Sequence, residues 1–436
     1  MDITVVGSGY VGTTLSACLA DMGHTVTAVD IDPDVVAALN EGSAAIHEPG
    51  LDALLAKHAG DRLHATTEYD SVPAADATFL AIGTPSRDDG SIDLGPLTAA
   101  AEMTGESIAD AHAHGEQRAN DRHLVVIKST ITPPGVDTIR RALRNSAGDV
   151  AESVELATNP EFLREGTAVQ DFQQPDKLVF GTDSEWATST LEALYEPLIA
   201  AAEPAVVRTD PETAMMIKYA NNAALAAKIS LANDLGNICK AFGIDAYEVM
   251  DAVGLDDRIG AKFLRSGVGY GGSCFPKDVD AIRAAARAAG YDPRLLDATV
   301  AVNDGQPERM LELLDTHVDT ASKRVAVLGL AFKPGTDDIR NSRAIPVIEG
   351  LVNRGATVVG YDPVATANMQ NRFPDIEYAD SAPAALQDAH AALVVTDWDE
   401  FAALDEAFDT MAEPIVIDGR RIIERREGLH YEGLTW

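Results

Sequence analysis

Asp2-Ile3-Thr4-Val5-Val6-Gly7-Ser8-Gly9-Tyr10-Val11-Gly12 joins a short apolar run to a glycine-rich turn, and a helical pattern from Tyr10 to Met22 follows. The glycines have G-x-G-x-x-G spacing. The first permits a tight turn, the second lets phosphates approach the backbone, and the third lets strand and helix pack closely. The helix N-terminus adds N–H donors and positive potential. The stretch therefore predicts a dinucleotide-binding turn made by Gly7, Gly9, Tyr10, Val11 and Gly12.

The next expected strand, Thr25–Val29, ends at a carboxylate, Asp30. A carboxylate at this position accepts hydrogen bonds from the adenosine ribose and repels a 2′-phosphate. The pattern favours NAD over NADP as the cofactor. A purely structural glycine turn is the alternative.

Apolar runs and helical patterns continue to alternate through the first half of the chain. Further strands are expected at Ala77–Ala81, Leu124–Ile127, Val154–Ala157 and Leu178–Phe180. Helices such as Leu94–Ala111 and Val136–Arg144 separate them. Such βαβ units build a mostly parallel, doubly wound sheet, which we expect to occupy residues 1–205.

A long helical pattern without strand signals follows, from Pro211 to near Gly243. With helices expected at Pro276–Ala289 and Pro293–Leu314, it predicts a central helical domain over 206–317. Its alanine-rich faces suit either a homodimer contact or packing within one chain.

Strand signals then return at Arg324–Leu328, Thr357–Tyr361, Ala391–Val395 and Ile415–Ile417. They predict a second α/β domain over 318–436. The expected fold class is α/β, with two Rossmann-like doubly wound domains joined by a long central helix, and a ligand cleft between the two domains.

Composition narrows the classes of partner. The 436 residues carry a formal net charge of −35 and are 46% hydrophobic, with acids spread through periodic apolar sequence. This indicates a folded, multidomain protein with an acidic surface, which we interpret as adaptation to high salt. Nucleic acid and anionic membranes are excluded as partners, because phosphate binding needs basic patches. No run is long enough to span a bilayer and no basic leader precedes the first strand, so a cytoplasmic location is expected.

The three cysteines lack the spacing of metal ligands, so neither a metal site nor a disulfide framework is expected. Cys18 and Cys239 lie in helical patterns and suit buried hydrophobic positions. Cys274 follows a glycine-rich stretch, Gly267–Ser273, and precedes Pro276, which suits the first turn of a helix. The helix N-terminus and Lys277 should lower the pKa of the Cys274 thiol. A thiolate beside NAD permits oxidation of an alcohol to an acid, because a thiohemiacetal still has a hydride to give.

Other polar groups accompany these motifs. Thr84 and Thr130 follow expected strands, where hydroxyls either face the ligand crevice or satisfy local backbone. The segment Asn159–Gly166 holds two carboxylates and an arginine, in either a site or a solvated loop. Lys218 and Asn222 share a helix face and could bracket an oxyanion, or form a structural polar pair.

Taken together, these residues resemble the nucleotide-sugar 6-dehydrogenase family. The matching stretches are G-S-G-Y-V-G at 7–12, H-E-P-G-L at 47–51, N-P-E-F-L-R-E-G at 159–166, K-Y-A-N-N at 218–222, R-I-G-A-K-F-L at 258–264, G-G-S-C-F-P-K-D at 271–278, F-K-P-G-T-D-D-I-R at 332–340 and D-G-R-R at 418–421. The resemblance implies a UDP-sugar site in the C-terminal domain. It also implies that NAD oxidises UDP-glucose to UDP-glucuronate.

Site residues follow from the same resemblance. The implied catalytic residues are Cys274 as nucleophile, Lys218 and Asn222 at the oxyanion, Asp278 and Glu161 as acid/base groups, and Thr130 on the hydrolytic water. The implied cofactor contacts include Val11, Asp30, Thr84, Thr130, Glu165, Lys277 and Arg340. The implied substrate contacts are Glu161, Phe162, Leu163, Arg164, Lys218, Asn222, Phe263, Gly271, Lys333 and Arg420, with Arg258 reaching the sugar nucleotide of a neighbouring subunit.

Three alternatives stay open. GDP-mannose and UDP-N-acetylhexosamine 6-dehydrogenases share the thiol chemistry, although Phe275 and the Arg258-Ile259-Gly260 stretch favour UDP-glucose. A silent protein that binds NAD or a nucleotide sugar is the non-enzyme alternative. The presence of Cys274, Lys218 and Asp278 together argues against it.

Overall fold

The structure is a computed structural model that describes residues 1–44, 46, 48–115 and 122–436. Its chain divides into two compact units, residues 1–221 and 222–436. The division falls within one long helix, α8 (Pro211–Ala241). Each unit contains a sheet of its own.

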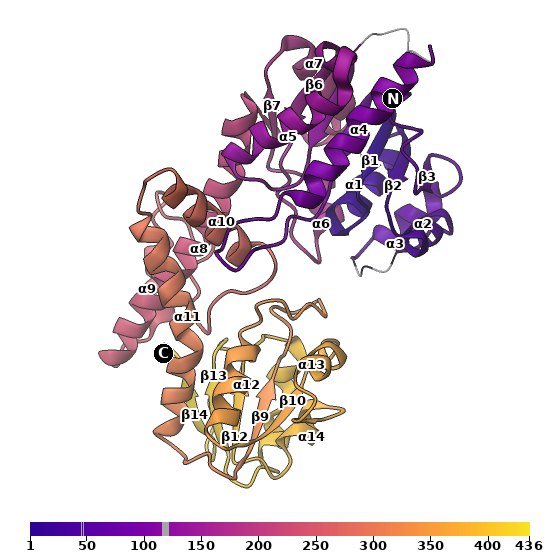
Figure 1. The fold of residues 1–436 in the computed structure, drawn as a ribbon. Helices are drawn as coiled ribbons and strands as arrows, with labels where there is room; N and C mark the ends of the chain where they lie inside the picture. The colour runs from indigo at the N-terminus through magenta and orange to yellow at the C-terminus, as the bar shows by residue number, and fades with distance from the viewer. Residues whose placement is uncertain (45, 47, 116–121) are drawn as a thin grey trace. The chain divides into compact units, whose positions relative to one another are not determined.

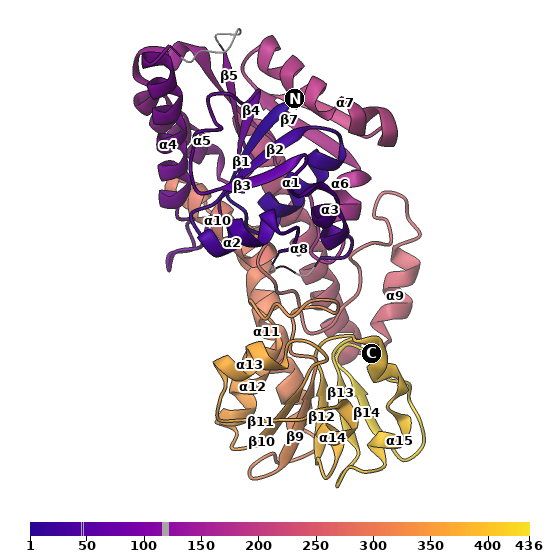
Figure 2. The same cartoon turned by 90° about the vertical axis from the view of Figure 1, so that its right-hand side faces the viewer.

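The first unit is built on an eight-stranded sheet with the order β3-β2-β1-β4-β5-β6-β7-β8. All neighbouring strands pair in parallel except β6 and β7, which are antiparallel. Figure 2 shows β3, β2, β1, β4 and β5 following one another across this sheet. Its strands are β1 (Asp2–Val6), β2 (Thr25–Val29), β3 (Leu63–Thr66), β4 (Ala77–Leu80), β5 (His123–Ile127), β6 (Val154–Thr158), β7 (Lys177–Thr182) and β8 (Ala205–Thr209).

Helices connect most of these strands, as is typical of βαβ crossovers, although no helix lies between β3 and β4. They are α1 (Tyr10–Asp21), α2 (Pro33–Asn40), α3 (Leu51–His58), α4 (Gly95–Ala113), α5 (Pro133–Ala147), α6 (Ala168–Gln173) and α7 (Glu185–Ala202), with a short 3₁₀ turn, η1 (Gly148–Ser153). Residues at the N-termini explain where several helices begin. The side chains of Asp32 and Ser184 cap α2 and α7, and a proline occupies the first turn of α5.

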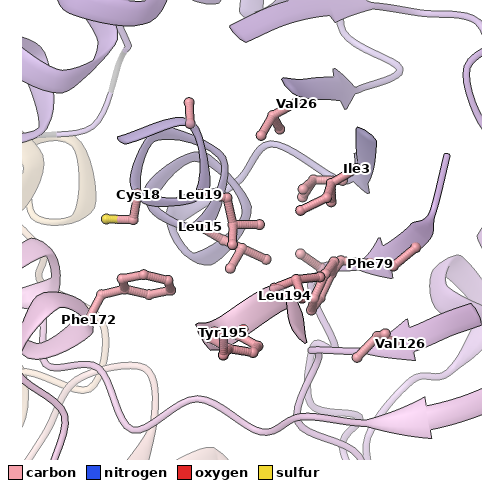
Figure 3. Close-up of a cluster of buried hydrophobic side chains, with 14 of the residues drawn as sticks. Ile3, Leu15, Cys18, Leu19, Val26, Phe79, Val126, Phe172, Leu194 and Tyr195 are labelled. Carbon is pink, nitrogen blue, oxygen red and sulfur yellow. The ribbon is translucent and has the colours of Figure 1, made fainter. Parts of the chain in front are cut away.

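The core of the first unit lies between sheet and helices. Figure 3 shows part of it, where Leu15, Cys18 and Leu19 of α1 lie with Ile3 and other apolar residues of the sheet. Buried strands that are apolar on both faces are typical of a parallel sheet covered on both sides. Burial raises the pKa of the Cys18 thiol to about 12. The expectation that Cys18 and Cys239 are buried is confirmed.

The second unit combines helices with a six-stranded parallel sheet of order β11-β10-β9-β12-β13-β14. Its strands are β9 (Arg324–Leu328), β10 (Thr357–Tyr361), β11 (Glu377–Tyr378), β12 (Ala391–Val394), β13 (Ile415–Asp418) and β14 (His430–Gly433). Besides the end of α8, its helices are α9 (Ala246–Val253), α10 (Phe275–Ala288), α11 (Arg294–Asp315), α12 (Ala344–Asn353), α13 (Thr366–Arg372), α14 (Ala382–Leu386) and α15 (Asp405–Phe408), with the 3₁₀ turn η2 (Asp399–Ala403). In Figure 1 this sheet and the helices from α12 onward are coloured orange to yellow.

The two Rossmann-like sheets and the long helix agree with the predicted fold class. The first sheet extends beyond the expected boundary at residue 205, because β8 begins there and pairs with β7. The short strands β3, β8, β11 and β14 were not predicted from the sequence. Within the described residues, no helix is long and apolar enough to cross a membrane.

Candidate active site

The glycine-rich turn of the first unit leads directly from β1 into α1. Gly7 has a φ of +95°, and an added Cβ would lie 2.7 Å from the carbonyl oxygen of Ala81. A Cβ on Gly12 would lie 1.8 Å from the carbonyl oxygen of Gly7, whereas one on Gly9 would meet nothing within 4 Å. Close packing therefore requires glycine at positions 7 and 12. Gly9 leaves open space beside the start of α1.

The same turn offers donors and an acceptor to a ligand. No described side chain caps the N-terminus of α1, and the buried Ser8 hydroxyl has no hydrogen-bond partner among the described residues. Asp30 accepts a hydrogen bond from the Ser8 amide (2.6 Å) through Oδ2 and one from the Asp32 amide (3.0 Å) through Oδ1. Uncapped N–H groups fit a pyrophosphate and a carboxylate fits a ribose. These residues therefore fit a dinucleotide.

The two threonines predicted from the sequence, Thr84 and Thr130, are in contact beyond the carboxyl ends of β4 and β5. The Thr84 hydroxyl donates to the backbone oxygen of Thr130 (3.0 Å), and Ser129 donates to Ile82 (2.7 Å). The adjacent strand ends are thus tied together at the edge where open α/β sheets bind ligands.

An ion pair follows the end of β6. The Lys218 ammonium donates to Oε1 of Glu161 at 3.0 Å, and the Leu163 amide donates to Oε2 at 2.6 Å. Both side chains are buried, 4% and 9% exposed for Lys218 and Glu161. Burial alone would raise the pKa of Glu161, but Lys218 and the Leu163 amide outweigh it and hold the pKa below its ordinary value. Glu161 is therefore an ionised, oriented carboxylate.

A second buried ammonium lies beside this pair. Lys128, directly after β5, donates to Oδ1 of Asn159 at 2.8 Å, and the Tyr195 hydroxyl donates to the same oxygen at 2.6 Å. Burial lowers the pKa of Lys128 to about 8, partly offset by the nearby charge of Glu161. Lys128 was not predicted as a site residue.

The remaining substrate positions of this loop differ in their surroundings. The Phe162 ring has two ammonium groups over it, Lys177 at 4.1 Å and Lys218 at 5.4 Å from the ring centroid. Arg164 is exposed and pairs with Asp171 at 2.6 Å. Cations over an aromatic face are favourable, so Lys177 helps to fix Phe162 next to Lys218.

In the second unit, Cys274 stands at the N-terminus of α10, as predicted from Pro276. It is the N-cap residue, and its thiol is exposed. The Ser273 hydroxyl lies 3.6 Å from the sulfur. An exposed thiol at a helix N-terminus has the environment of a nucleophile.

Asp278, one turn into α10, is 2% exposed and lies between two donors. Nδ2 of Asn222 donates to Oδ2 and the Lys277 ammonium donates to Oδ1, each at 2.6 Å. The structure thus brings Asn222 together with Lys277 and Asp278, whereas in the sequence Asn222 belongs to a separate motif. A fixed carboxylate orients the Asn222 amide.

The backbone that leads to Cys274 is held by buried side-chain amides. Gly267 donates to Asn233 and accepts from Gln306, both at 2.7 Å, and the Tyr270 amide and carbonyl pair with the single side chain of Asn303 at 2.8 and 3.1 Å. We call Asn233, Asn303 and Gln306 the amide clamp. Polar amides within apolar helix patterns are the sequence signal that could have revealed it, because buried amides need partners.

The C-terminal loops complete the support of this segment. Gly272 donates to the carbonyl oxygen of Arg340 (2.9 Å), and Asn341 donates to that of Gly272 (3.0 Å). A Cβ on Gly271 would lie 2.2 Å from the Asn341 oxygen. Arg420 donates to Gly269 (3.2 Å). Gly271 is therefore a glycine because the backbone of residue 341 touches it.

Four further predicted contacts lie at or near the surface of this unit. Lys333 has its ammonium 5.5 Å from the Phe332 ring centroid, and Phe263 has a strained φ of +65°. Arg258 and Arg340 are exposed and pair with Asp256 and Asp338. His47 of the H-E-P-G-L stretch lies outside the described residues.

The predicted site residues form two groups. Glu161, Phe162, Lys218, Thr84, Thr130 and the turn at 7–12 belong to the first unit, and Asn222, Lys277, Asp278, Cys274, Gly271 and Arg420 belong to the second. Sequence reasoning missed Lys128, Asn159, Lys177 and the amide clamp. Within the described part of the chain, no cluster of three or more His, Cys, Asp or Glu side chains could hold a metal ion.

Comparison with known proteins matches this arrangement domain by domain. Residues 1–199 match the NAD binding domain of the UDP-glucose/GDP-mannose dehydrogenase family, residues 212–305 its central domain and residues 326–425 its UDP binding domain. UDP-glucose 6-dehydrogenase AglM from Haloferax volcanii is 61% identical over 438 residues, covering 100% of both chains. UDP-glucose 6-dehydrogenase from Rhizobium meliloti is 40% identical over 438 residues, covering 98% of this chain and 97% of the relative.

Solved structures agree. A UDP-glucose dehydrogenase from Pyrobaculum islandicum superimposes with a TM-score of 0.92 at 38% identity, covering 100% of this chain and 98% of the other. A UDP-D-ManNAc dehydrogenase from Pyrococcus horikoshii gives 0.86 at 27% identity, covering 100% and 99%. This chain belongs to the UDP-glucose/GDP-mannose dehydrogenase family, and residues 1–199 are its NAD-binding domain.

Proposed function

We propose that this protein oxidises the C6 alcohol of UDP-glucose to the carboxylate of UDP-glucuronate. One alcohol, one water and two NAD⁺ give one carboxylate, two NADH and three protons. NAD⁺ takes a hydride from the sugar carbon in each of two oxidations. The observation that carries the proposal is the exposed Cys274 thiol at the start of α10, with Asp278 one turn further on and the family match around both.

The cysteine divides the oxidation into two steps. After the first oxidation, Sγ bonds to the aldehyde carbon and the carbonyl oxygen takes a proton, which gives a thiohemiacetal. After the second, the same carbon is a thioester. Water then adds to it, the C–S bond breaks, and the thiol takes back a proton. The bound intermediate keeps the reactive aldehyde from leaving.

The charged groups suit the proton and charge changes of these steps. Ionised Glu161 and buried Asp278 are carboxylates that can accept protons from the alcohol or from water. Lys218 and Asn222 are donors that can stabilise an oxyanion on the sugar carbon. Thr130 would orient the water. Lys218 and Asn222 lie one turn apart on α8.

Binding roles follow the same division. For NAD, we propose the turn at Gly7–Gly12 with Asp30, Thr84, Thr130, Glu165, Lys277 and Arg340. For the sugar nucleotide, we propose Phe162, Leu163, Arg164, Phe263, Gly271, Lys333 and Arg420. The support is the contact of Asp30 with the glycine-rich turn, of Leu163 with Glu161, and of Arg340 and Arg420 with the loop before Cys274.

NADH release with a panel of nucleotide sugars tests the substrate. UDP-glucose should yield two NADH per molecule, and GDP-mannose and UDP-N-acetylglucosamine should yield little. Turnover of GDP-mannose alone would overturn the substrate. NADH release from none of the three, with NAD still bound, would favour the silent binding protein.

We propose a homodimer formed through α8. Three apolar residues of this helix and Phe242, directly after it, are exposed at spacings of four, three and four residues: Leu231, Leu235, Ile238 and Phe242. Such spacing places them on one stripe, as in paired helices. In a dimer the exposed Arg258 could reach the neighbouring subunit. Light scattering of Leu235→Asp against the unaltered protein should show a monomer against a dimer.

We also propose that the protein works in a salt-rich cytoplasm. The net charge of −35 favours solutions in which counterions screen repulsion between carboxylates. An exposed catalytic thiol stays reduced in a cytoplasm. Activity should rise from low to molar KCl, and loss of activity in high salt would contradict the salt adaptation.

A further inference from the structure

Glu48 is a buried carboxylate, 4% exposed, that none of the roles above uses. It belongs to the H-E-P-G-L stretch and lies shortly before α3. Carboxylates are rarely buried without partners, because removing the charge from water is costly. Its partners therefore indicate what it does.

Three donors from two separate motifs converge on this carboxylate. The Gly166 amide donates to Oε2 at 2.7 Å, and the Ala168 amide donates to Oε1 at 2.7 Å. The Tyr10 hydroxyl donates to Oε2, and the Gly166 amide lies 3.3 Å from that hydroxyl. Burial and the Glu48 charge raise the pKa of Tyr10, so the phenol remains a donor. Hydrogen bonds to a charged acceptor are the stronger kind.

The two motifs that Glu48 joins both carry residues that we propose to contact NAD. Tyr10 is the first residue of α1, directly after Gly9 of the dinucleotide turn. Gly166 directly follows Glu165, and Ala168 begins α6. We propose that Glu48 is a positioning residue for NAD, which holds Tyr10 and the Glu165-Gly166 peptide at a fixed separation. This proposal rests on the NAD-binding domain and not on the sugar substrate.

The decisive variant is Glu48→Gln, which keeps the size of the side chain but replaces one acceptor oxygen with an NH₂ group. We expect the dissociation constant for NAD to rise about tenfold, because one or two charge-assisted hydrogen bonds are lost. The dissociation constant for the nucleotide sugar should change by less than about threefold, which is less than the loss of one typical hydrogen bond would cause. Tyr10→Phe removes one of the three donors, so it should weaken NAD binding less than Glu48→Gln.

Asp21→Asn is the matched control. Asp21 is the last residue of α1, and it pairs with Lys57 (2.6 Å) and His58 (2.9 Å) of α3, at the opposite end of α1 from Tyr10. The Asp21→Asn variant should lower the midpoint of thermal unfolding by an amount similar to that of the Glu48→Gln variant. It should leave the affinity for NAD unchanged. Titration with NAD and thermal unfolding, both without sugar, separate this proposal from the choice of substrate. Unchanged NAD affinity in Glu48→Gln, or equal weakening in Asp21→Asn, would overturn it.

Discussion

The two sheets of this protein begin alike and are used differently. The first six strands of each sheet have the order 3-2-1-4-5-6. In both sheets a glycine after the first strand donates to the last residue of the second: Gly7 to Val29 at 2.7 Å, and Gly329 to Tyr361 at 2.9 Å. Each second strand is followed by an aspartate, Asp30 or Asp362. The difference lies in what these aspartates hold.

Asp362 is used entirely by its own domain. It is 2% exposed, and it accepts from four backbone amides, those of residues 330, 331, 364 and 365, and from the Trp398 indole. Asp30 accepts from Ser8 and Asp32 and is only partly buried. The first aspartate can therefore serve a ligand, and the second stabilises a turn.

The segment between the first strand and the next helix also differs between the two sheets. In the first sheet three residues separate β1 from α1, whose N-terminus is uncapped. In the second, residues 329–343 separate β9 from α12, and this long loop carries Lys333 and Arg340. Loops tolerate insertions and carry function when a rigid sheet positions them. The second sheet thus has a long loop where the first has a short glycine-rich turn, and its aspartate holds backbone amides of its own domain.

Removing the structural aspartate should have the largest effect on stability. Asp362→Ala leaves five donors without their acceptor and should cost about 3 kcal/mol or more of unfolding free energy. The dissociation constant for NAD should change by less than about twofold, because the NAD-binding domain spans residues 1–199 and does not include Asp362. Denaturant unfolding and NAD titration check both. Should the variant not fold, Trp398→Phe removes a single donor and should show the same pattern weakly.

Two residues at corresponding positions of the two sheets should make the unfolding free energy depend on pH with opposite signs. Lys128 follows β5 and Asp418 ends β13, the fifth strand of each order. Burial lowers the pKa of Lys128 from 10.5 to about 8, and burial raises that of Asp418 above 3.8 despite its backbone hydrogen bonds.

From about pH 8 to 10.5 the unfolded chain binds more protons at Lys128, so the unfolding free energy should rise with pH, by about 3 kcal/mol at most. Above pH 3.8 the folded chain binds more protons at Asp418, so stability should fall as pH rises through its folded pKa. Unfolding at several pH values should show that Lys128→Met removes the rise and Asp418→Asn removes the fall. An unaltered slope in either variant would contradict the assignment.

The ligand-facing aspartate should have the smallest effect on stability and a moderate one on binding. Asp30→Ala should weaken NAD about tenfold, because hydrogen bonds to a charged acceptor are lost. It should also narrow the preference for NAD over NADP, since the repulsion of a 2′-phosphate is removed. Dissociation constants for both dinucleotides measure this, with Asp32→Asn as the neighbouring control. If Asp32→Asn weakened NAD binding as much as Asp30→Ala, the loss of a negative charge in this region, and not a contact of Asp30, would explain the effect.

The sequence predicted what depends on local pattern. The glycine spacing at 7–12, the apolar strands and Pro276 at the start of α10 each depend on a few neighbouring residues, and the structure agrees with them. The similarity between Asp30 and Asp362 was also visible. Their different use was not, because it depends on which distant amides each carboxylate meets.

Long-range partners account for the rest. The pairing of Asn303 with Tyr270, or of Lys128 with Asn159, joins residues more than thirty positions apart. Strands β3 and β8 lie at the two edges of the sheet, where most of their side chains are only partly buried, so they lack the continuous apolar run of a central strand such as β5. These features are set by tertiary contacts that no local pattern records.

The proposed oxidation uses two NAD⁺ on one sugar carbon, which Cys274 holds covalently between the two steps. The most direct test is the ratio of NADH to UDP-glucuronate, with mass spectrometry of the rapidly quenched Cys274 peptide, in the unaltered protein and in Cys274→Ser. The unaltered protein should give a ratio of two and a peptide with a thioester-linked sugar nucleotide. The variant should give no thioester and almost no acid. A variant that still makes acid with two NADH at the normal rate would contradict the account.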